Sequence, residues 1–159
     1  MIKAVRSFAT VVCMTVLAVG CGSPGSDTTF RPPTGWNSTP GVFGRFQMWI
    51  TGSAQADRQV VILVRGDQNT RIDDPQMFGT TRGVHDVRHR AVKLCGSQPA
   101  DSFTGRGESV NGSNRVPESV EGVTTTIGSS KYIALYIHPL AMKPDAQAQA
   151  ALRSLCPRQ

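Results

Sequence analysis

The alternation of apolar and polar residues predicts most of the secondary structure of this chain. Residues 42–51 alternate, with Phe46 and Met48 on the same side, which is typical of a strand with one buried face. Residues 59–65 are apolar on both sides and rich in β-branched side chains, which predicts a central strand covered on both faces. The residues between them, 52–55, predict a turn, so the two strands should form a hairpin.

The same pattern predicts further strands in the second half of the chain. Residues 88–94 should form a strand that leads into Cys95. Residues 102–110 and 119–127 should pair as a hairpin, because the sequence Asn-Gly-Ser-Asn at 111–114 favours a tight turn. Residues 131–138 are the most strand-like part of the chain, and both of their faces are apolar enough to require cover.

One helix is predicted at the C-terminal end. Residues 144–155 are rich in alanine, begin at Pro144, and place Ala148, Ala151, Leu152 and Leu155 in one apolar stripe. Pro157 should end the helix. Residues 73–75, with the sequence Asp-Asp-Pro, could begin a second short helix. These elements predict an α+β fold: an antiparallel sheet of five or six strands with a C-terminal helix packed on one face.

The first residues differ from the rest and predict export. Lys3 and Arg6 precede an uncharged, mostly apolar stretch at 8–20, followed by small residues. This is the pattern of a secretory signal peptide, here residues 1–20. As a helix, the apolar stretch would reach about 20 Å, which is too short to span a membrane permanently.

The end of this signal, Ala18-Val19-Gly20-Cys21, resembles the lipobox of bacterial lipoproteins. The resemblance implies that the Cys21 thiol receives a diacylglycerol, that Cys21 becomes the new N-terminus, and that a further acyl chain such as palmitate is added. Ala18 stands where an aliphatic residue is more usual, and the same sequence would suit ordinary signal peptidase. Lipidation predicts a membrane anchor on the extracytoplasmic side of the bacterial cell envelope, whereas plain secretion predicts a soluble product.

The mature chain should consist of a tether and one domain. Residues after Cys21 are mostly Gly, Pro, Ser and Thr, and are expected to form a flexible tether over residues 21–35, which includes the lipidated cysteine. Residues 36–159 are long enough for a single domain with one core. Trp36 should pack onto that domain.

Two cysteines remain once the signal and the lipid site are set aside, Cys95 and Cys156. Two thiols in an oxidising compartment favour a disulfide bond, which would close a loop of about 60 residues and stabilise the fold by roughly 4 kcal/mol. Two separate buried thiols are the alternative. A metal site is less well supported, because no Cys-x-x-Cys motif or nearby histidine cluster supplies four ligands.

The charge of the chain is positive. The net charge is +6, and removal of Lys3 and Arg6 with the signal leaves +4. Part of it is a basic cluster beside His85 and His89, made of Arg82, Arg88, Arg90 and Lys93. This cluster could attract anionic lipids or acidic envelope polymers, or it could be a solvated surface. No motif suggests a nucleic-acid partner.

The sequence contains no recognisable catalytic motif. His85 and His89 are four residues apart and would lie on one side of a strand, about 13 Å apart, which is too far for joint binding of a metal. His138 is expected to be a structural histidine with its hydrogen bonds satisfied. No Gly-x-Ser-x-Gly or phosphate-binding loop is present. We therefore expect no enzymatic activity, no metal and no cofactor.

A second resemblance covers roughly residues 36–157. The sequence Cys-Gly-Ser-Gln-Pro-Ala at 95–100, a glycine-spaced hairpin, the Tyr-Ile-Ala-Leu-Tyr strand and an alanine-rich helix that ends Ser-Leu-Cys-Pro are similar to small PsbP-like envelope domains. The resemblance implies an α-β-α sandwich used for binding or scaffolding, with structural cysteines and no catalytic residues.

Two functions remain as hypotheses. The first is a non-enzymatic envelope lipoprotein whose domain binds or scaffolds another envelope component, a protein or a polymer. The alternative is an exported small-molecule or metal binder with possible hydrolytic activity that uses His85 and His89. A deep pocket with converging polar groups would favour the second, and a shallow exposed surface would favour the first.

Overall fold

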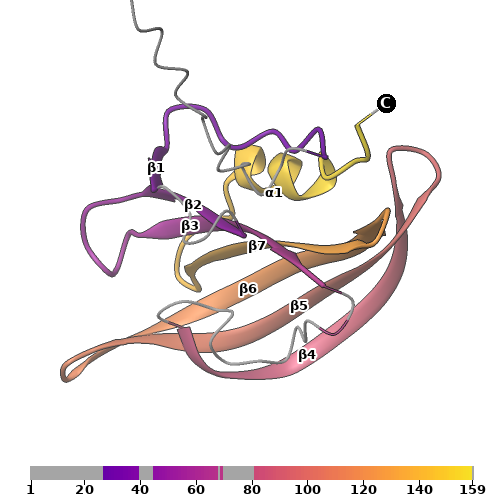
Figure 1. Ribbon diagram of the computed structural model, residues 1–159. Coiled ribbons are helices and arrows are strands. Elements are labelled where there is room, and N and C mark those ends of the chain that lie inside the picture. Colours follow the sequence, from indigo (N-terminus) through magenta and orange to yellow (C-terminus); the bar gives the residue numbers. More distant parts are fainter. Residues whose placement is uncertain (1–26, 40–44, 68, 70–80, 159) are drawn as a thin grey trace, which may run out of the picture.

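The computed structural model describes residues 27–39, 45–67, 69 and 81–158. Within these residues, seven strands form one open antiparallel sheet in the order β1-β2-β3-β7-β6-β5-β4, and one short helix packs against it (Figure 1). The strands are β1 (Asn37–Thr39), β2 (Phe46–Thr51), β3 (Gln59–Gly66), β4 (Thr81–Leu94), β5 (Gln98–Asn111), β6 (Asn114–Ile127) and β7 (Ser130–Pro139). The helix is α1 (Ala146–Arg153). The fold is mostly β, with a C-terminal helix on one face of the sheet.

The predicted strands are present, and the predicted hairpins pair β2 with β3 and β5 with β6. Residues 42–44 of the first predicted strand lie outside the described residues. The expectation of five or six strands is wrong by one, because the sequence pattern predicted no strand at the position of β1. Its three exposed polar residues show no hydrophobic alternation, and its place in the sheet depends on backbone pairing with β2.

The predicted helix is confirmed, but its start is not. Asp145 is the N-cap, because its side chain accepts hydrogen bonds from the backbone N–H groups of Gln147 (2.8 Å) and Ala148 (3.0 Å). Pro144 therefore precedes the cap and does not occupy the first helical position. Within the described residues α1 is the only helix, so the second helical layer of an α-β-α sandwich is not found among them. The possible helix start at residues 73–75 lies outside them.

The sheet separates two apolar layers, as the alternation in β7 predicted. Tyr132, Ala134 and Tyr136 face α1 and pack with Trp49 and the buried side of the helix. Ile133, Leu135 and Ile137 form the other layer with side chains of β3 and β6. Because both faces of β3 and β7 are covered, these two strands form the centre of the molecule.

The segment that precedes β1 lies against the domain on the same side of the sheet as α1 (Figure 1). Thr28 forms a β-bridge with Pro157 and is buried, and the ring of Phe30 lies 5.3 Å from that of Trp49. Trp36 packs on the domain, as expected, with its ring 6.5 Å from that of Tyr136. The part of the expected tether that the structure describes, from Asp27 onward, is therefore packed on the domain.

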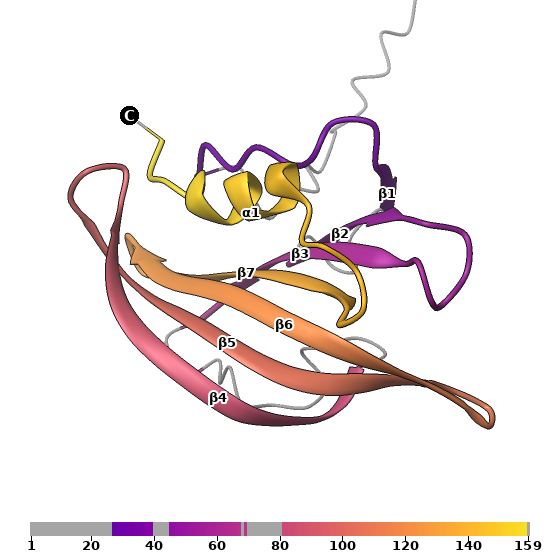
Figure 2. The same ribbon diagram turned by 180° about the vertical axis from the view of Figure 1, so that it is seen from behind.

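Strands β4, β5 and β6 are long and strongly curved, and β4 is the outermost strand (Figure 2). Curvature requires small residues where strands and side chains approach closely. The absence of a side chain at Gly107 leaves room for the methyl group of Thr81 in β4, and the absence of one at Gly122 leaves room for the ring of Phe103. These glycines allow β4, β5 and β6 to curve around the apolar layer on the face opposite α1.

Cys95 and Cys156 are joined by a disulfide bond, with their Cα atoms 6.0 Å apart. Cys95 lies in the turn between β4 and β5, and Cys156 follows α1. The bond therefore ties the edge hairpin of the sheet to the end of the helix. Cys21 and the signal segment, residues 1–20, lie outside the described residues.

Candidate functional site: an arginine face on β4 and β5

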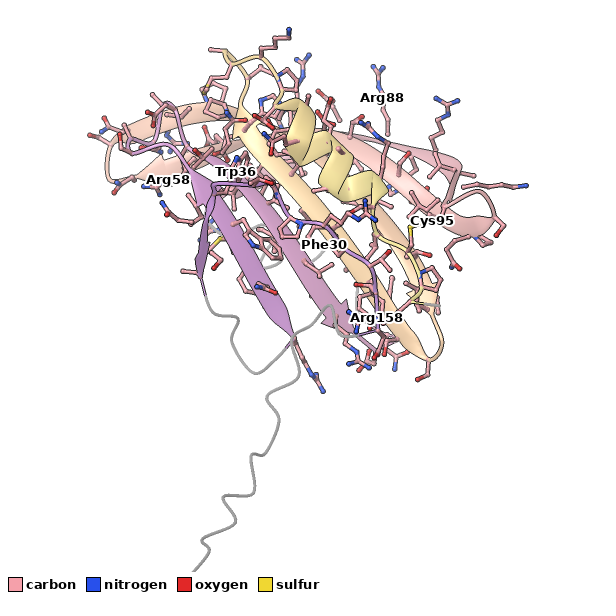
Figure 3. All side chains as sticks on the ribbon, turned by 90° about the horizontal axis from the view of Figure 1, so that it is seen from above. Phe30, Trp36, Arg58, Arg88, Cys95 and Arg158 are labelled. Carbon is pink, nitrogen blue, oxygen red and sulfur yellow. A yellow bond between two sulfur atoms is a disulfide. The ribbon has the colours of Figure 1, made fainter. Side chains whose placement is uncertain are left out.

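Three arginines lie together on the solvent-exposed part of the sheet beside α1. Arg88 pairs with Thr104, Arg90 pairs with Ser102, and Arg106 pairs with His85. Residues paired across an antiparallel sheet point to the same side, and Phe103 points to the side opposite α1. Its neighbours in β5 must therefore point to the α1 side. Figure 3 shows Arg88 beside the helix, on the side that the helix covers.

We call the surface formed by Arg88, Arg90 and Arg106 the arginine face. Among the described residues, no carboxylate forms an ion pair with any of the three, whereas Arg115, near the hairpin tip, pairs with Glu108. All three arginine residues are exposed. Side chains two apart in a strand are about 7 Å from each other, so three guanidinium groups repeat at a short spacing. A planar guanidinium can bind a phosphate or carboxylate with two parallel hydrogen bonds.

The basic residues identified in the sequence are divided between the two sides of the sheet. Arg88 and Arg90 belong to the arginine face, but Lys93 pairs with Pro99 and points to the opposite side. Arg106 joins the face from β5, 16 residues or more along the chain from its neighbours in β4. The sequence did not indicate Arg106 as part of this cluster, because its place beside Arg88 and Arg90 depends on the register between β4 and β5.

His85 and His89 do not form a joint site. The register of β4 shifts between Arg82 and His85 and again between His85 and Arg88, and Asp86 has a positive φ of 52° at this irregularity. The extra residue turns His85 toward the arginine face and His89 toward Phe103, so the expectation that both lie on one side is wrong.

Each of these histidines has a separate partner. His85 Nδ1 lies 2.8 Å from the backbone oxygen of Gly83, and His89 Nδ1 lies 2.6 Å from a carboxylate oxygen of Asp101. Among the described residues, no group of three His, Cys, Asp or Glu side chains is arranged to hold a metal ion.

A buried polar network lies under the start of α1. The hydroxyl group of Tyr136 donates to the side-chain oxygen of Gln59 and accepts a 2.8 Å hydrogen bond from the backbone N–H of Asp145. Burial raises the pKa of Tyr136 to about 12, so this hydroxyl stays protonated. The network links the N-cap of α1 to β3 and β7, and it positions the helix on the sheet.

His138 extends this network. Its ring stacks on Tyr136 at 4.9 Å, and Nδ1 lies 2.9 Å from the oxygen of Pro139. Nε2 is buried and has no hydrogen-bond partner among the described residues, so the expectation of a fully satisfied histidine is wrong. The nearest carboxylate oxygen, from Glu121, is 3.8 Å away, which is too long for a hydrogen bond. Interaction with His138 is the main reason that the pKa of Glu121 is lowered, ahead of a hydrogen bond from Gln149.

A second buried carboxyl group, that of Glu118, lies on the far side of the sheet. Thr81 Oγ1 donates a 2.7 Å hydrogen bond to it. Burial raises the pKa of Glu118, and this outweighs the opposing effects of Thr81 and of the charge on Arg58. Among the described residues, the contacts of these two carboxyl groups include no serine, cysteine or lysine side chain.

The hollows at the other end of the sheet are open and shallow. One, of about 460 Å³, is lined by the disulfide, Thr29, Gln98 and Arg158. The other, of about 530 Å³, is lined mainly by threonines of β6, the start of β5 and Lys131. Both are open to solvent, and the second brings together one acidic and one basic side chain, those of Asp101 and Lys131.

The described residues contain no helix that is both long enough and apolar enough to cross a membrane. The full chain matches no protein-family model and no curated protein sequence. The arginine face is therefore the feature that argues most directly for a function.

Proposed function

We propose that this chain is an exported bacterial lipoprotein, held on the extracytoplasmic side of a membrane by lipid on Cys21. Its domain is a non-enzymatic module that binds or scaffolds another component of the cell envelope. We further take the domain to be of the PsbP-like type. The lipobox-like sequence at 18–21 and the paired cysteines of an oxidising compartment support the localisation.

One observation carries the binding function, the arginine face. Unpaired arginines on a rigid sheet attract anions without the entropic cost of ordering a loop. The partner that complements them is an acidic envelope polymer, whose phosphate or carboxylate groups repeat along a chain. The alternative, a metal binder or hydrolase that uses His85 and His89, has less support because the two side chains point to opposite sides of the sheet.

Binding of a defined anionic polymer tests this function. The full chain carrying Cys21→Ser is exported without lipid, and its affinity for inorganic polyphosphate and for polyglutamate is measured by isothermal titration at low and moderate salt. The triple variant Arg88→Gln, Arg90→Gln and Arg106→Gln should bind about 30-fold more weakly, since each exposed ion pair contributes about 0.7 kcal/mol and three contribute about 2 kcal/mol.

The control removes three other exposed cations, by Arg45→Gln, Lys93→Gln and Arg158→Gln. It changes the net charge equally but leaves the arginine face intact. An equal loss in both variants would mean that total charge and not this face governs binding, and would overturn the assignment. A preference for polyphosphate over polyglutamate would identify the partner's anionic group as phosphate.

A further inference from the structure

Asp27 is the first residue that the structure describes, and it is held at one end of the sheet. Its carboxylate forms a 2.8 Å ion pair with Arg65 Nη2 and accepts a 3.2 Å hydrogen bond from the hydroxyl group of Tyr132. Its backbone oxygen accepts a 3.0 Å hydrogen bond from the N–H of Arg158. The next residue, Thr28, is 2% exposed and pairs with Pro157. The position at which the chain enters the domain is therefore fixed.

Six residue steps separate Cys21 from Asp27. A chain of that length spans at most about 22 Å, whatever its conformation. We call the end of the sheet where Asp27 enters the anchor end. It comprises the start of β2, the ends of β3, β4 and β6, the starts of β5 and β7, and the residues after α1. With lipid on Cys21, Asp27 at the anchor end lies no more than about 22 Å from the lipidated residue.

The anchor end is basic. Its described cations are Arg45, Arg65, Lys93, Lys131 and Arg158, and its described acidic residues are fewer: Asp27, which pairs with Arg65, Asp67, and Asp101, which pairs with His89. The opposite end carries mixed charges: Arg58 is next to Asp57 in the chain, Arg115 pairs with Glu108, and Lys143 is two residues from Asp145. Figure 3 places Arg158 at the anchor end and Arg58 toward the opposite end.

We propose that the anchor end lies directly on the membrane, and that its basic side chains bind anionic phospholipid headgroups. This inference rests on the lipid at Cys21 that is part of the proposed function. The open hollow of about 460 Å³ between the disulfide and Arg158 leaves room for a headgroup beside a cation. Headgroup charges act within about 8 Å at physiological salt, so the basic side chains must come to the membrane surface, which the short connection to Cys21 allows.

The orientation has a consequence for the arginine face. The strands run away from the anchor end, so the hairpin tip at residues 111–114 becomes the part of the domain farthest from the membrane. The arginine face lies along the side of the molecule, between the two ends, and stays accessible to a polymer. Two basic surfaces thus contact two different anionic partners.

Vesicle binding separates these surfaces. The full chain with Cys21→Ser is mixed with vesicles of pure phosphatidylcholine or of phosphatidylcholine with 40% phosphatidylglycerol, and the bound fraction is measured by sedimentation. We expect binding only to the anionic vesicles. The variant Arg45→Gln, Lys93→Gln and Arg158→Gln should bind on the order of 100-fold more weakly, because each basic residue near an anionic surface strengthens binding about fivefold.

The matched control is the arginine-face variant, with Arg88→Gln, Arg90→Gln and Arg106→Gln, which should lose less than fivefold on the same vesicles. Equal losses in both variants, or equal binding to neutral and anionic vesicles, would overturn the inference. If the arginine-face variant loses more, the membrane is the partner of that face and the inference is also overturned.

The orientation is measured on the acylated protein in the same anionic vesicles. Ser129→Cys places a fluorophore in the exposed β6–β7 turn at the anchor end, and Ser113→Cys places one at the exposed opposite tip. Energy transfer to a headgroup-labelled lipid should be strong from Ser129 and weak from Ser113, and equal transfer would contradict the orientation.

The intact mass of the membrane-extracted protein reports the lipid separately. Absence of acyl mass would reject the proposed lipoprotein and, with it, the anchored orientation. An acylated protein with equal transfer from both dyes would reject the orientation alone.

Discussion

Gly122 in β6 lies directly beneath the ring of Phe103, its antiparallel partner in β5. A Cβ atom at this position would overlap the ring and would also lie 2.9 Å from Cδ2 of Leu135. We expect Gly122→Ala to lower the free energy of unfolding by about 1–3 kcal/mol, because the buried ring cannot move without disturbing the layer beneath it. Urea denaturation followed by tryptophan fluorescence measures the change.

Two controls identify the cause. Thr126→Ala, at an exposed position of the same strand, should change stability by less than about 0.5 kcal/mol. Phe103→Leu should cost less stability in the Gly122→Ala background than in the wild type, since it relieves the overlap. Additive effects would show that the ring is not the reason for glycine at position 122.

Glu118 makes the stability of the fold depend on pH. Burial raises its pKa in the folded protein above the usual value near 4.5, so the folded state favours the protonated form. Its contribution to stability is fully present below the unfolded-state pKa and is lost as the pH rises through the folded-state pKa.

Glu118→Gln should remove this loss while its amide oxygen still accepts the hydrogen bond from Thr81. We expect wild type and variant to be similar near pH 4 and the variant to be more stable at pH 7. Denaturation curves across this pH range give the difference in free energy of unfolding between the two proteins. Both contain Glu121, so its effect cancels in the difference. A variant that becomes relatively less stable as the pH rises would contradict the assignment.

At the scale of elements, the disulfide connects two parts that few other contacts join. It links the β4–β5 turn to the residue after α1 and closes a loop with a sequence separation of 61. The chain-entropy model gives about 4 kcal/mol for such a loop. Cys95→Ser with Cys156→Ser, or reduction of the wild type, should lower the free energy of unfolding by about that amount.

Reduction should have no effect on the stability of the double variant, which serves as the control. Within the oxidised and reduced wild type, amide hydrogen exchange should rise first in α1 and in the β4–β5 turn, because these elements lose their connection. Uniform acceleration throughout the sheet would indicate that the bond stabilises the whole domain and not this junction.

The elements show which features a sequence pattern can predict. Strands β2, β3 and β7 alternate or are apolar throughout, and the helix carries an apolar stripe, so hydrophobic periodicity was enough to find them. β1 consists of exposed Asn, Ser and Thr, and only backbone pairing makes it a strand. The register shifts in β4 depend on its fit to β5, so sequence spacing predicted the wrong side for His89 relative to His85. The segment at 27–36 has the composition of a linker, and the residues that hold it on the domain, such as Cys156 and Gln147, are far away in the sequence.

At the scale of the whole molecule, the positive charge of the chain is not spread evenly. One group of cations forms the arginine face beside α1, and another surrounds the anchor end, whereas the opposite end has charges of both signs. The net charge could be counted from the sequence, but this separation could not, because it depends on which strands are neighbours and on where the chain enters. The triple variants described above test the two groups against each other.

The segment from Asp27 to Trp36 also determines how the domain would respond to being pulled. It enters beside Arg65 at the anchor end and runs to Tyr136 near the opposite end, with Thr29 and Thr34 bonded to the residues around α1 on the way. If the chain is held by lipid on Cys21, as we propose, tension on it would act along this segment. The contacts of the segment would then bear the load in shear, all at the same time. A cell-wall component that pulled on the domain would therefore load all contacts between this segment and the domain before any one of them could break.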